Sequence, residues 1–244
     1  MNPAPTADFR RLTAVGPYFA LDTPASADDT PPPGYRPLRE LYDGGPDGPL
    51  AARVHVVAQR LATAELRVAA SILHLGLAAR FWSVGVGAAV LLGAVPPLDE
   101  AWMRIPDQGP IDLWTPQGRP TVGTLPRQLH HVIVEGQLEP LAEAVRAVVP
   151  LSARLLLGNS ASALAGTLRV LDGHAPDTAR TLVAEVLGRP PFADTGALHT
   201  GADGTGAHGT AFRRRSCCLY YRVGPGAGVC GDCCFTRPPA VRNP

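Results

Sequence analysis

The chain has 244 residues, of which 45% are apolar and 18% charged, which is enough apolar material for a sizeable core and argues against wholesale disorder. The formal net charge of +1 gives no sign of a nucleic-acid or anionic-membrane partner. All 22 basic residues are arginine, and with the abundance of Ala, Gly and Pro this indicates a compositional bias. Single arginines therefore carry less functional weight than usual.

The predicted elements begin with a Pro-rich N-terminal arm over residues 1–36, which contains PPPGYRP at 31–37. It has no basic stretch leading into an apolar core, so we expect no secretory signal. Apolar residues at helical spacing between Leu50 and Arg80 predict one or two helices, and helical character continues at 84–93.

The longest uncharged stretch, Phe81–Leu98, reaches the lower length limit of a membrane span. It contains three glycines, ends in Pro96-Pro97 and is flanked closely by Arg80 and Asp99. We interpret it as a buried helix and expect a cytoplasmic protein without membrane insertion. In that compartment thiols stay reduced, so clustered cysteines favour metal binding or redox chemistry over disulfides.

Residues 104–124 predict a short β segment, with Ile111–Thr115 as its strand. Helical pattern returns at 126–149 and 152–172, and Asp177 can cap a further helix that ends at Leu187. Residues 193–210 predict a Gly-rich connector. AFRRRS and LYYRV predict β-leaning pieces around the first cysteines. We expect an α+β fold, with the arm, a predominantly helical body at 37–208 and a cysteine-bearing segment at 209–244.

All five cysteines lie between positions 217 and 234, in the order Cys217-Cys218, eleven residues, then Cys230-Gly-Asp-Cys233 and Cys234. A Cys-x-x-Cys pair can turn both sulfurs toward one metal. Adjacent cysteines in a strand point to opposite faces, so they share a site only if the backbone bends there. The glycines of GPGAG at 224–228 allow the chain to fold back. Four thiolates suit an iron–sulfur cluster or a tetrahedral zinc.

Four arginines lie near these cysteines, and two interpretations remain open for them. They could offset the negative charge of a thiolate-held cluster and raise its reduction potential. They could equally form a solvated face. The four are Arg213, Arg214, Arg215 and Arg222.

The segment SCCLYYR, followed by CGDC, resembles the C-terminal motif of the FhuF-type ferric-siderophore reductases. LLLGNSASALAG at 155–166 and the apolar run at 71–98 are also similar to that family, although only the cysteine motif is specific. The resemblance implies a [2Fe–2S] cluster with Cys217, Cys218, Cys230 and Cys233 as ligands. This chain has one residue more than is usual between the second and third cysteines. Cys234 is additional, and spacing favours Cys233 over Cys234 as the fourth ligand.

The resemblance implies an oxidoreductase of iron acquisition that reduces siderophore-bound Fe(III) to Fe(II), which oxygen ligands hold less tightly. A hydroxamate siderophore is favoured as substrate, bound by the helical body. The sequence shows no dinucleotide fingerprint or phosphate loop, so we expect electron transfer from an external donor such as a ferredoxin or a flavin reductase. Tyr220, Tyr221 and Trp82 are candidates for aromatic contact with substrate, although core packing is favoured for Tyr220 and Trp82.

Three other functions remain open at this point. The first is an iron–sulfur redox or iron sensor, for which a DNA-reading segment is expected and only RRR at 213–215 is present. The second is a structural zinc-binding helical protein. The third is a siderophore-binding domain without redox activity, against which the four cysteines argue.

Overall fold

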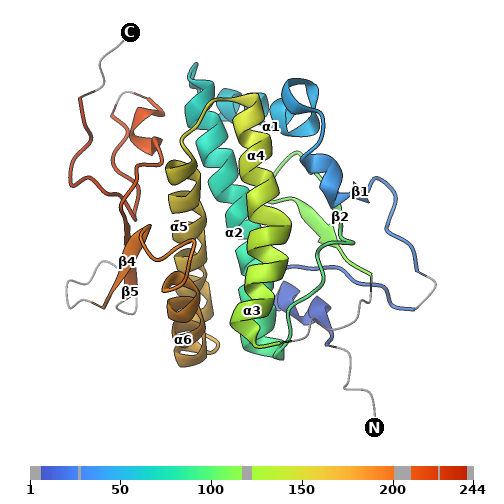
Figure 1. Ribbon diagram of the computed structural model, residues 1–244. Coiled ribbons are helices and arrows are strands. Elements are labelled where there is room, and N and C mark those ends of the chain that lie inside the picture. Colours follow the sequence, from blue (N-terminus) through green and yellow to red (C-terminus); the bar gives the residue numbers. More distant parts are fainter. Residues whose placement is uncertain (1–6, 27–28, 117–122, 201–209, 225, 241–244) are drawn as a thin grey trace.

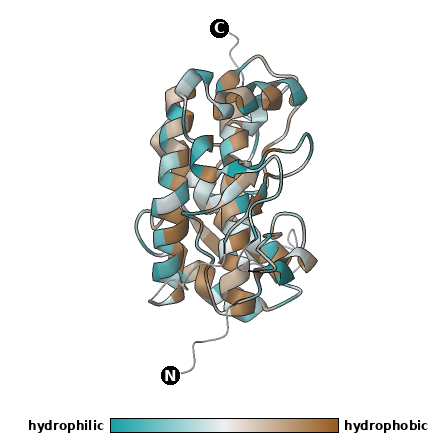
Figure 2. Ribbon diagram, turned by 90° about the vertical axis from the view of Figure 1, so that its right-hand side faces the viewer, coloured by the Kyte–Doolittle hydropathy of each residue, from teal (hydrophilic) through white to brown (hydrophobic). Residues whose placement is uncertain are grey.

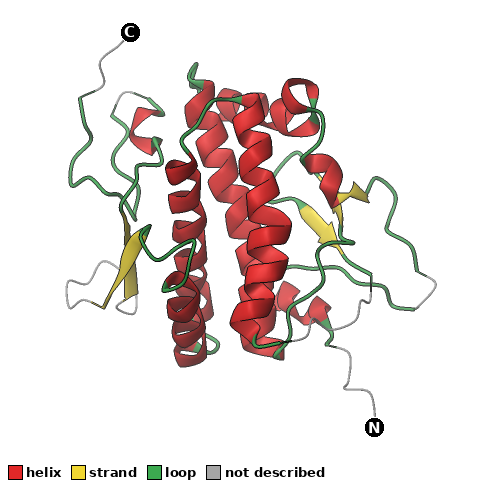
Figure 3. Ribbon diagram, in the orientation of Figure 1, coloured by secondary structure: helices red, strands yellow, loops and turns green. Residues whose placement is uncertain are grey.

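The computed structural model describes residues 7–26, 29–116, 123–200, 210–224 and 226–240. Helices form its centre, a small antiparallel sheet lies on one side of them, and a two-stranded hairpin with the cysteine segment lies on the other (Figures 1 and 3). The predicted α+β fold class is confirmed. The helices are α1 (Pro49–Arg60), α2 (Leu66–Leu92), α3 (Leu125–Leu129), α4 (Glu139–Val148), α5 (Ala153–Leu171) and α6 (Pro176–Leu187), with a π-helix at His130–Leu138 joining α3 to α4.

The strands are short and pair only with neighbours in the chain order. In the first sheet β1 (Arg36–Pro37) pairs with β2 (Trp102–Arg104), which pairs with β3 (Asp112–Trp114). In the second, β4 (Gly196–Thr200) pairs with β5 (Thr210–Arg214). Single 3₁₀ turns complete the architecture at Phe9–Ala14, Leu38–Leu41, Gly45–Asp47 and Tyr220–Arg222.

Helix α2 is the longest element, and the other helices pack around it (Figure 1). It is long and apolar enough to cross a membrane by length and composition, but 67% of its most apolar window is buried inside the protein. A core helix passes the same test, so the predicted buried helix is confirmed. Figure 2 shows apolar residues alternating with hydrophilic ones along the outer helices, as expected where each helix buries one face.

Glycines occur inside α2 where other side chains approach its backbone closely. A Cβ atom at Gly85 would lie 2.9 Å from Cγ1 of Ile133, and one at Gly87 would lie 2.6 Å from Cδ1 of Phe19. Both distances are too short for real atoms. Glycine at these two positions therefore lets Ile133 of the π-helix and Phe19 of the N-terminal segment pack against the backbone of α2.

The sequence places Arg80 next to the uncharged stretch that begins at Phe81. In the structure it lies inside α2. Its side chain is buried and donates hydrogen bonds to three carbonyls, those of Ile111 (2.8 Å), Tyr18 (2.6 Å) and Ala20. Burial lowers its pKa to about 10, which leaves it charged at neutral pH. One side chain thus ties the N-terminal segment and the approach to β3 onto α2.

The N-terminal arm packs more closely than its Pro-rich composition implies. Leu12, Phe19 and Leu21 are fully buried in the common core. Residues 1–6 and 27–28 of the arm lie outside the described residues. The division into an arm, a helical body at 37–208 and a cysteine-bearing segment at 209–244 stays a prediction.

Three local predictions differ from the structure. Asp177 does not cap α6: the helix begins at Pro176 after Ala175, and Asp177 instead pairs with Arg180 at 3.0 Å. LYYRV is not a strand but a 3₁₀ turn, because the left-handed Leu219 ends the extended backbone. The Gly-rich connector contains β4, which backbone pairing with β5 stabilises despite its composition; residues 201–209 lie outside the described part.

Replacing Arg80 by Leu should lower the free energy of unfolding by about 3 kcal/mol or more, because three buried carbonyls lose their donor. Arg80→Lys should fall between Leu and the wild type, since one ammonium cannot reach all three. Thermal unfolding followed by circular dichroism measures the effect. Arg10→Leu, at an exposed position, is the control; equal midpoints for Arg80→Leu and Arg10→Leu would contradict the role of Arg80.

Candidate metal centre

The cysteine segment returns along β5 and is held to it by backbone hydrogen bonds. The amide of Arg214 donates to the carbonyl of Asp232 (3.0 Å), and the amide of Arg215 donates to that of Thr195 (2.7 Å). The hairpin and this segment lie on the α5 side of the helices (Figure 1). Cys218 lies beside Ser71 of α2, and Cys230 lies beside Arg214, which contacts the inner face of α5.

The backbone bends just after the two adjacent cysteines. Leu219 has φ +68°, a left-handed conformation that turns the chain immediately after Cys218. The Sγ atoms of Cys218 and Cys230 are 3.4 Å apart, close to the about 3.8 Å kept by two thiolates on one tetrahedral metal. The amide of Cys233 donates to the carbonyl of Cys230 (3.1 Å), which closes the Cys-x-x-Cys turn.

Backbone amides point at two of the other sulfurs. The amide of Leu219 donates to Sγ of Cys217 (3.3 Å), and that of Phe235 donates to Sγ of Cys233 (3.4 Å). Such hydrogen bonds stabilise a thiolate more than a thiol. The hydrogen bond between the sulfurs of Cys218 and Cys230 lowers the pKa of Cys218 to about 7. The same hydrogen bond raises the pKa of Cys230, and burial raises the pKa of Cys217, so the sulfurs are not uniformly shifted toward the thiolate.

Arg214 is the one arginine of the group whose guanidinium reaches a cysteine sulfur in the described residues. Its side chain is only 3% exposed. It donates to Oδ1 of Asn159 (2.7 Å), to Oγ of Ser162 (3.1 Å) and to Sγ of Cys230 (3.7 Å). Its Nε has no hydrogen-bond partner among the described residues. None of these three partners is a carboxylate, but the buried carboxylate of Asp232 accepts a hydrogen bond from the same Ser162. Negative charge on the sulfur side would add to that of Asp232 in stabilising the buried cation.

A polar network joins α2, α5 and the cysteine segment beneath this arginine. Nδ2 of Asn159 donates to the carbonyl (3.0 Å) and Oγ (3.1 Å) of Ser71, whose hydroxyl donates to the carbonyl of Cys218 (2.8 Å). Ser162 also donates to Asp232. Sequence reasoning missed Ser71 and Ser162. The sequence did contain a signal for Ser162. Asn159 and Ser162 are polar residues three positions apart, so they lie on one face of a helix, and both are buried in the structure.

The remaining sequence candidates separate by exposure. Arg213 is exposed and donates to the carbonyl of Cys234 (3.4 Å), and Arg215 is exposed and pairs with Asp194 (3.2 Å). Trp82 is fully buried against Phe192, as expected from core packing. The favoured core packing of Tyr220 is wrong: it is 41% exposed, because the 3₁₀ turn lies outside the hairpin.

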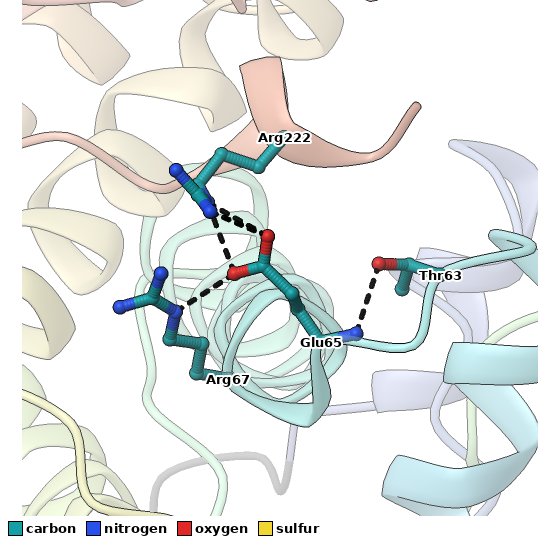
Figure 4. A network of polar contacts seen from close by, with 4 residues as sticks. All are labelled: Thr63, Glu65, Arg67 and Arg222. Carbon is teal, nitrogen blue, oxygen red and sulfur yellow. Dashed lines mark hydrogen bonds and ion pairs between the residues drawn. The ribbon is translucent and has the colours of Figure 1, made fainter. Parts of the chain in front are cut away.

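Arg222 fastens the cysteine segment to the start of α2 (Figure 4). Its Nε and Nη2 donate to both carboxylate oxygens of Glu65 at 2.6 to 3.0 Å, and Arg67 adds a hydrogen bond of 2.9 Å. Glu65 is the N-cap residue of α2, where the helix dipole favours a negative charge. The hydrogen bond from Arg222 lowers the pKa of Glu65. We call this contact the Glu65–Arg222 clamp.

Comparison with known families finds one match in this region. The model of the FhuF 2Fe-2S C-terminal domain matches residues 214–235, which begin at the buried arginine and include all five cysteines. Over these residues the chain is similar to the [2Fe–2S] domain of FhuF-type proteins. The resemblance predicted from the cysteine motif is thereby confirmed, and the cofactor is a [2Fe–2S] cluster. No curated protein matches the chain.

The residues present fit an FhuF-type cluster. Four thiolates and two sulfides around two ferric ions would carry net negative charge, which would stabilise the buried guanidinium of Arg214 beside Cys230. Within the described residues no three His, Cys, Asp or Glu side chains surround a single metal position. The four thiols are therefore not gathered around one point, although Cys218 and Cys230, one from each pair, lie 3.4 Å apart.

Replacing Arg214 by Gln should lower the reduction potential of the cluster, because a buried positive charge stabilises the more negative reduced form. Redox titration followed by visible absorption measures the shift. Arg213→Gln is the matched control, since it removes the same charge from the neighbouring exposed position. Equal shifts in both variants would contradict a specific role for Arg214, while Arg214→Lys should recover part of the potential.

Breaking the Glu65–Arg222 clamp should speed the loss of cluster to a chelator. Glu65→Gln and Arg222→Gln should each lower the free energy of unfolding by about 1 kcal/mol. The double variant should lower it little further than either single variant, because both remove the same interaction. Because the pKa of Glu65 is lowered, the clamp should act fully above the ordinary value of 4.5 and be lost as the pH falls below it. Arg67→Gln, which is half exposed, is the control. Additive costs would contradict a direct interaction.

Proposed function

We propose that this chain is a cytoplasmic ferric-siderophore reductase whose cluster is held by Cys217, Cys218, Cys230 and Cys233. The observation that carries the proposal is the FhuF-type match over a segment whose two cysteine pairs converge beside a buried arginine. When bound, the cluster supplies one-electron chemistry: its reduced form loses one electron, and the siderophore-bound Fe(III) becomes Fe(II). Hard oxygen ligands hold Fe(II) less tightly, so the iron is released.

The chain contributes positioning and charge. Arg214 holds a positive charge against the sulfur of Cys230, and the amides of Leu219 and Phe235 orient the sulfurs of Cys217 and Cys233. No proton transfer by a side chain is needed for this reaction. That agrees with a sequence in which no general acid, base or nucleophile stands out.

The fourth ligand in this proposal is Cys233, with Cys234 as a spare thiol. The amide of Cys233 closes the turn by donating to the carbonyl of Cys230, and its Sγ accepts a hydrogen bond from the amide of Phe235. The contacts therefore support the choice that spacing favoured.

The electrons come from an external donor, a ferredoxin or a flavin reductase. Cys217 and Cys233 are half-buried, so the proposed cluster lies near enough to the surface for a protein donor to approach. Beside them Tyr220 is exposed, and Tyr221 makes an edge contact with Phe235 at 6.1 Å between ring centroids. These aromatic rings border the site from the solvent side.

Protein purified without oxygen should be coloured, contain about two iron and two sulfide per chain, and bleach on reduction with dithionite. Adding a ferric trihydroxamate to the bleached sample should restore the colour within the mixing time or soon after, with Fe(II) captured by a ferrous chelator in equal amount. A cluster that bleaches but is not reoxidised by ferric chelates would contradict the reductase and favour the sensor. A colourless protein with zinc and no iron would contradict the cofactor itself.

Single Cys→Ser variants assign the ligands in the same experiment. Changes at positions 217, 218, 230 and 233 should abolish or shift the visible bands, whereas Cys234→Ser should leave the spectrum unchanged. Loss of the spectrum in Cys234→Ser together with its retention in Cys233→Ser would exchange the two assignments.

A further inference from the structure

Four large hydrophobic side chains are exposed in the part of the chain that the structure describes. Two of them, Tyr18 and Val170, border a groove of about 470 Å³ between α2 and α5, which Cys230 also lines. The other two, Tyr220 and Phe235, belong to the cysteine segment itself. Exposed apolar side chains that gather at one place mark interaction sites. In the described residues that place is the surroundings of the proposed cluster.

Three aromatic residues of the cysteine segment lie beside a proposed ligand. Tyr221 contacts Phe235 edge to face, with 6.1 Å between the ring centroids, and Tyr220 precedes Tyr221 in the same 3₁₀ turn. The amide of Phe235 donates to Sγ of Cys233 (3.4 Å). We call Tyr220, Tyr221 and Phe235 the aromatic patch. A molecule seated on Phe235 is therefore separated from the sulfur of Cys233 by little more than this residue.

Positive charge is concentrated in the same segment. Residues 210–240 contain five arginines and one acidic residue, a net charge of +4, whereas the whole chain carries +1. A [2Fe–2S] cluster held by four thiolates offsets about two of these charges. Arg213 and Arg237 are exposed, and neither has a carboxylate partner among the described residues. Arg213 donates to the carbonyl of Cys234, and Arg237 follows Phe235 by two positions, so the two arginines form a basic rim of the aromatic patch.

Aromatic side chains with arginines around them favour a protein partner that has an acidic surface. Tyr and Arg are enriched at the energetic centres of protein interfaces, and opposite charges on two surfaces speed their encounter. A second copy of this chain would bring two basic rims together in a symmetric contact, which charge repulsion opposes. Free reduced flavin is a small molecule, for which a pocket is the usual site, whereas the aromatic patch is exposed.

We propose that the aromatic patch and its basic rim form the docking surface for an acidic one-electron carrier protein. This inference rests on the proposed function and chooses between the two kinds of electron donor that it leaves open. In the docked complex the carrier is oxidised by one electron and the cluster is reduced by one electron, with no bond made or broken. Tyr220 and Phe235 contact the carrier, and Arg213 and Arg237 pair with its carboxylates.

Docking is measured without electron transfer by calorimetric titration of the cluster-loaded protein with an oxidised flavodoxin, an acidic carrier. Reversing both rim charges, Arg213→Glu with Arg237→Glu, should weaken binding at low salt by about tenfold or more and reduce its dependence on salt. The matched control is Arg36→Glu with Arg39→Glu. It makes the same change in net charge at exposed positions beside the three-stranded sheet, on the opposite side of the helices (Figure 1).

Tyr220→Ala tests the aromatic part of the surface. It should weaken flavodoxin binding by about fivefold at low and high salt alike, because a tyrosine at the centre of an interface contributes apolar contact. Tyr18→Ala is the matched control, since Tyr18 is exposed to nearly the same degree but borders the groove. Tyr220→Ala also serves as the test if the charge-reversed protein does not retain its cluster.

The outcomes separate the docking surface from the proposed function. Reoxidation of the dithionite-reduced wild type by a ferric trihydroxamate tests the reductase without any carrier. If that reoxidation occurs while the rim and control variants bind flavodoxin alike, the docking surface is overturned and the reductase stands. Faster reduction of the cluster by free reduced flavin than by reduced flavodoxin at equal concentration overturns the carrier as donor. A wild type that is dimeric and becomes monomeric in Tyr220→Ala assigns the surface to a second copy and overturns it too.

Discussion

The buried guanidinium of Arg214 is the interaction on which the arrangement of this protein depends. A cation almost wholly removed from water must have hydrogen-bond acceptors on one side and negative charge on the other. Asn159 and Ser162 of α5 supply the acceptors, and the sulfur of Cys230 lies on the remaining side. The helical body and the cysteine segment therefore both provide hydrogen-bond acceptors for the guanidinium of Arg214. Each is incomplete without the other, which couples cluster binding to the folding of the tail.

The helical body acts as a scaffold for a site that it does not itself contain. Ser71 on α2 and Asn159 on α5 hold the carbonyl of Cys218 and the guanidinium of Arg214 at fixed positions. The rigidity of α2 comes from close packing at its glycines and from Arg80, which binds three carbonyls of distant segments. The Glu65–Arg222 clamp then fastens the turn between the two cysteine pairs to the start of the same helix. A tail with little secondary structure is thus placed by side-chain contacts to regular elements.

This construction suits electron transfer better than acid–base catalysis. The proposed ligands lie partly at the surface, where a donor protein can approach, and one of them forms the end of a groove of ligand size. A donor and a chelate could then reach the cluster from different sides.

The sequence alone determined the α+β class, the buried central helix and the FhuF-type [2Fe–2S] domain, because each depends on local spacing: apolar residues at helical period, and cysteines in a recognisable order. It could not choose among neighbouring arginines, since Arg213, Arg214 and Arg215 look alike in sequence and only the alternation of β5 buries the middle one. It also misjudged Tyr220 and the LYYRV segment, where one left-handed residue redirects the chain. Ser71, Ser162 and the groove were decided only by tertiary structure, because they depend on contacts such as that of Ser71 with Cys218, residues 147 positions apart in the chain.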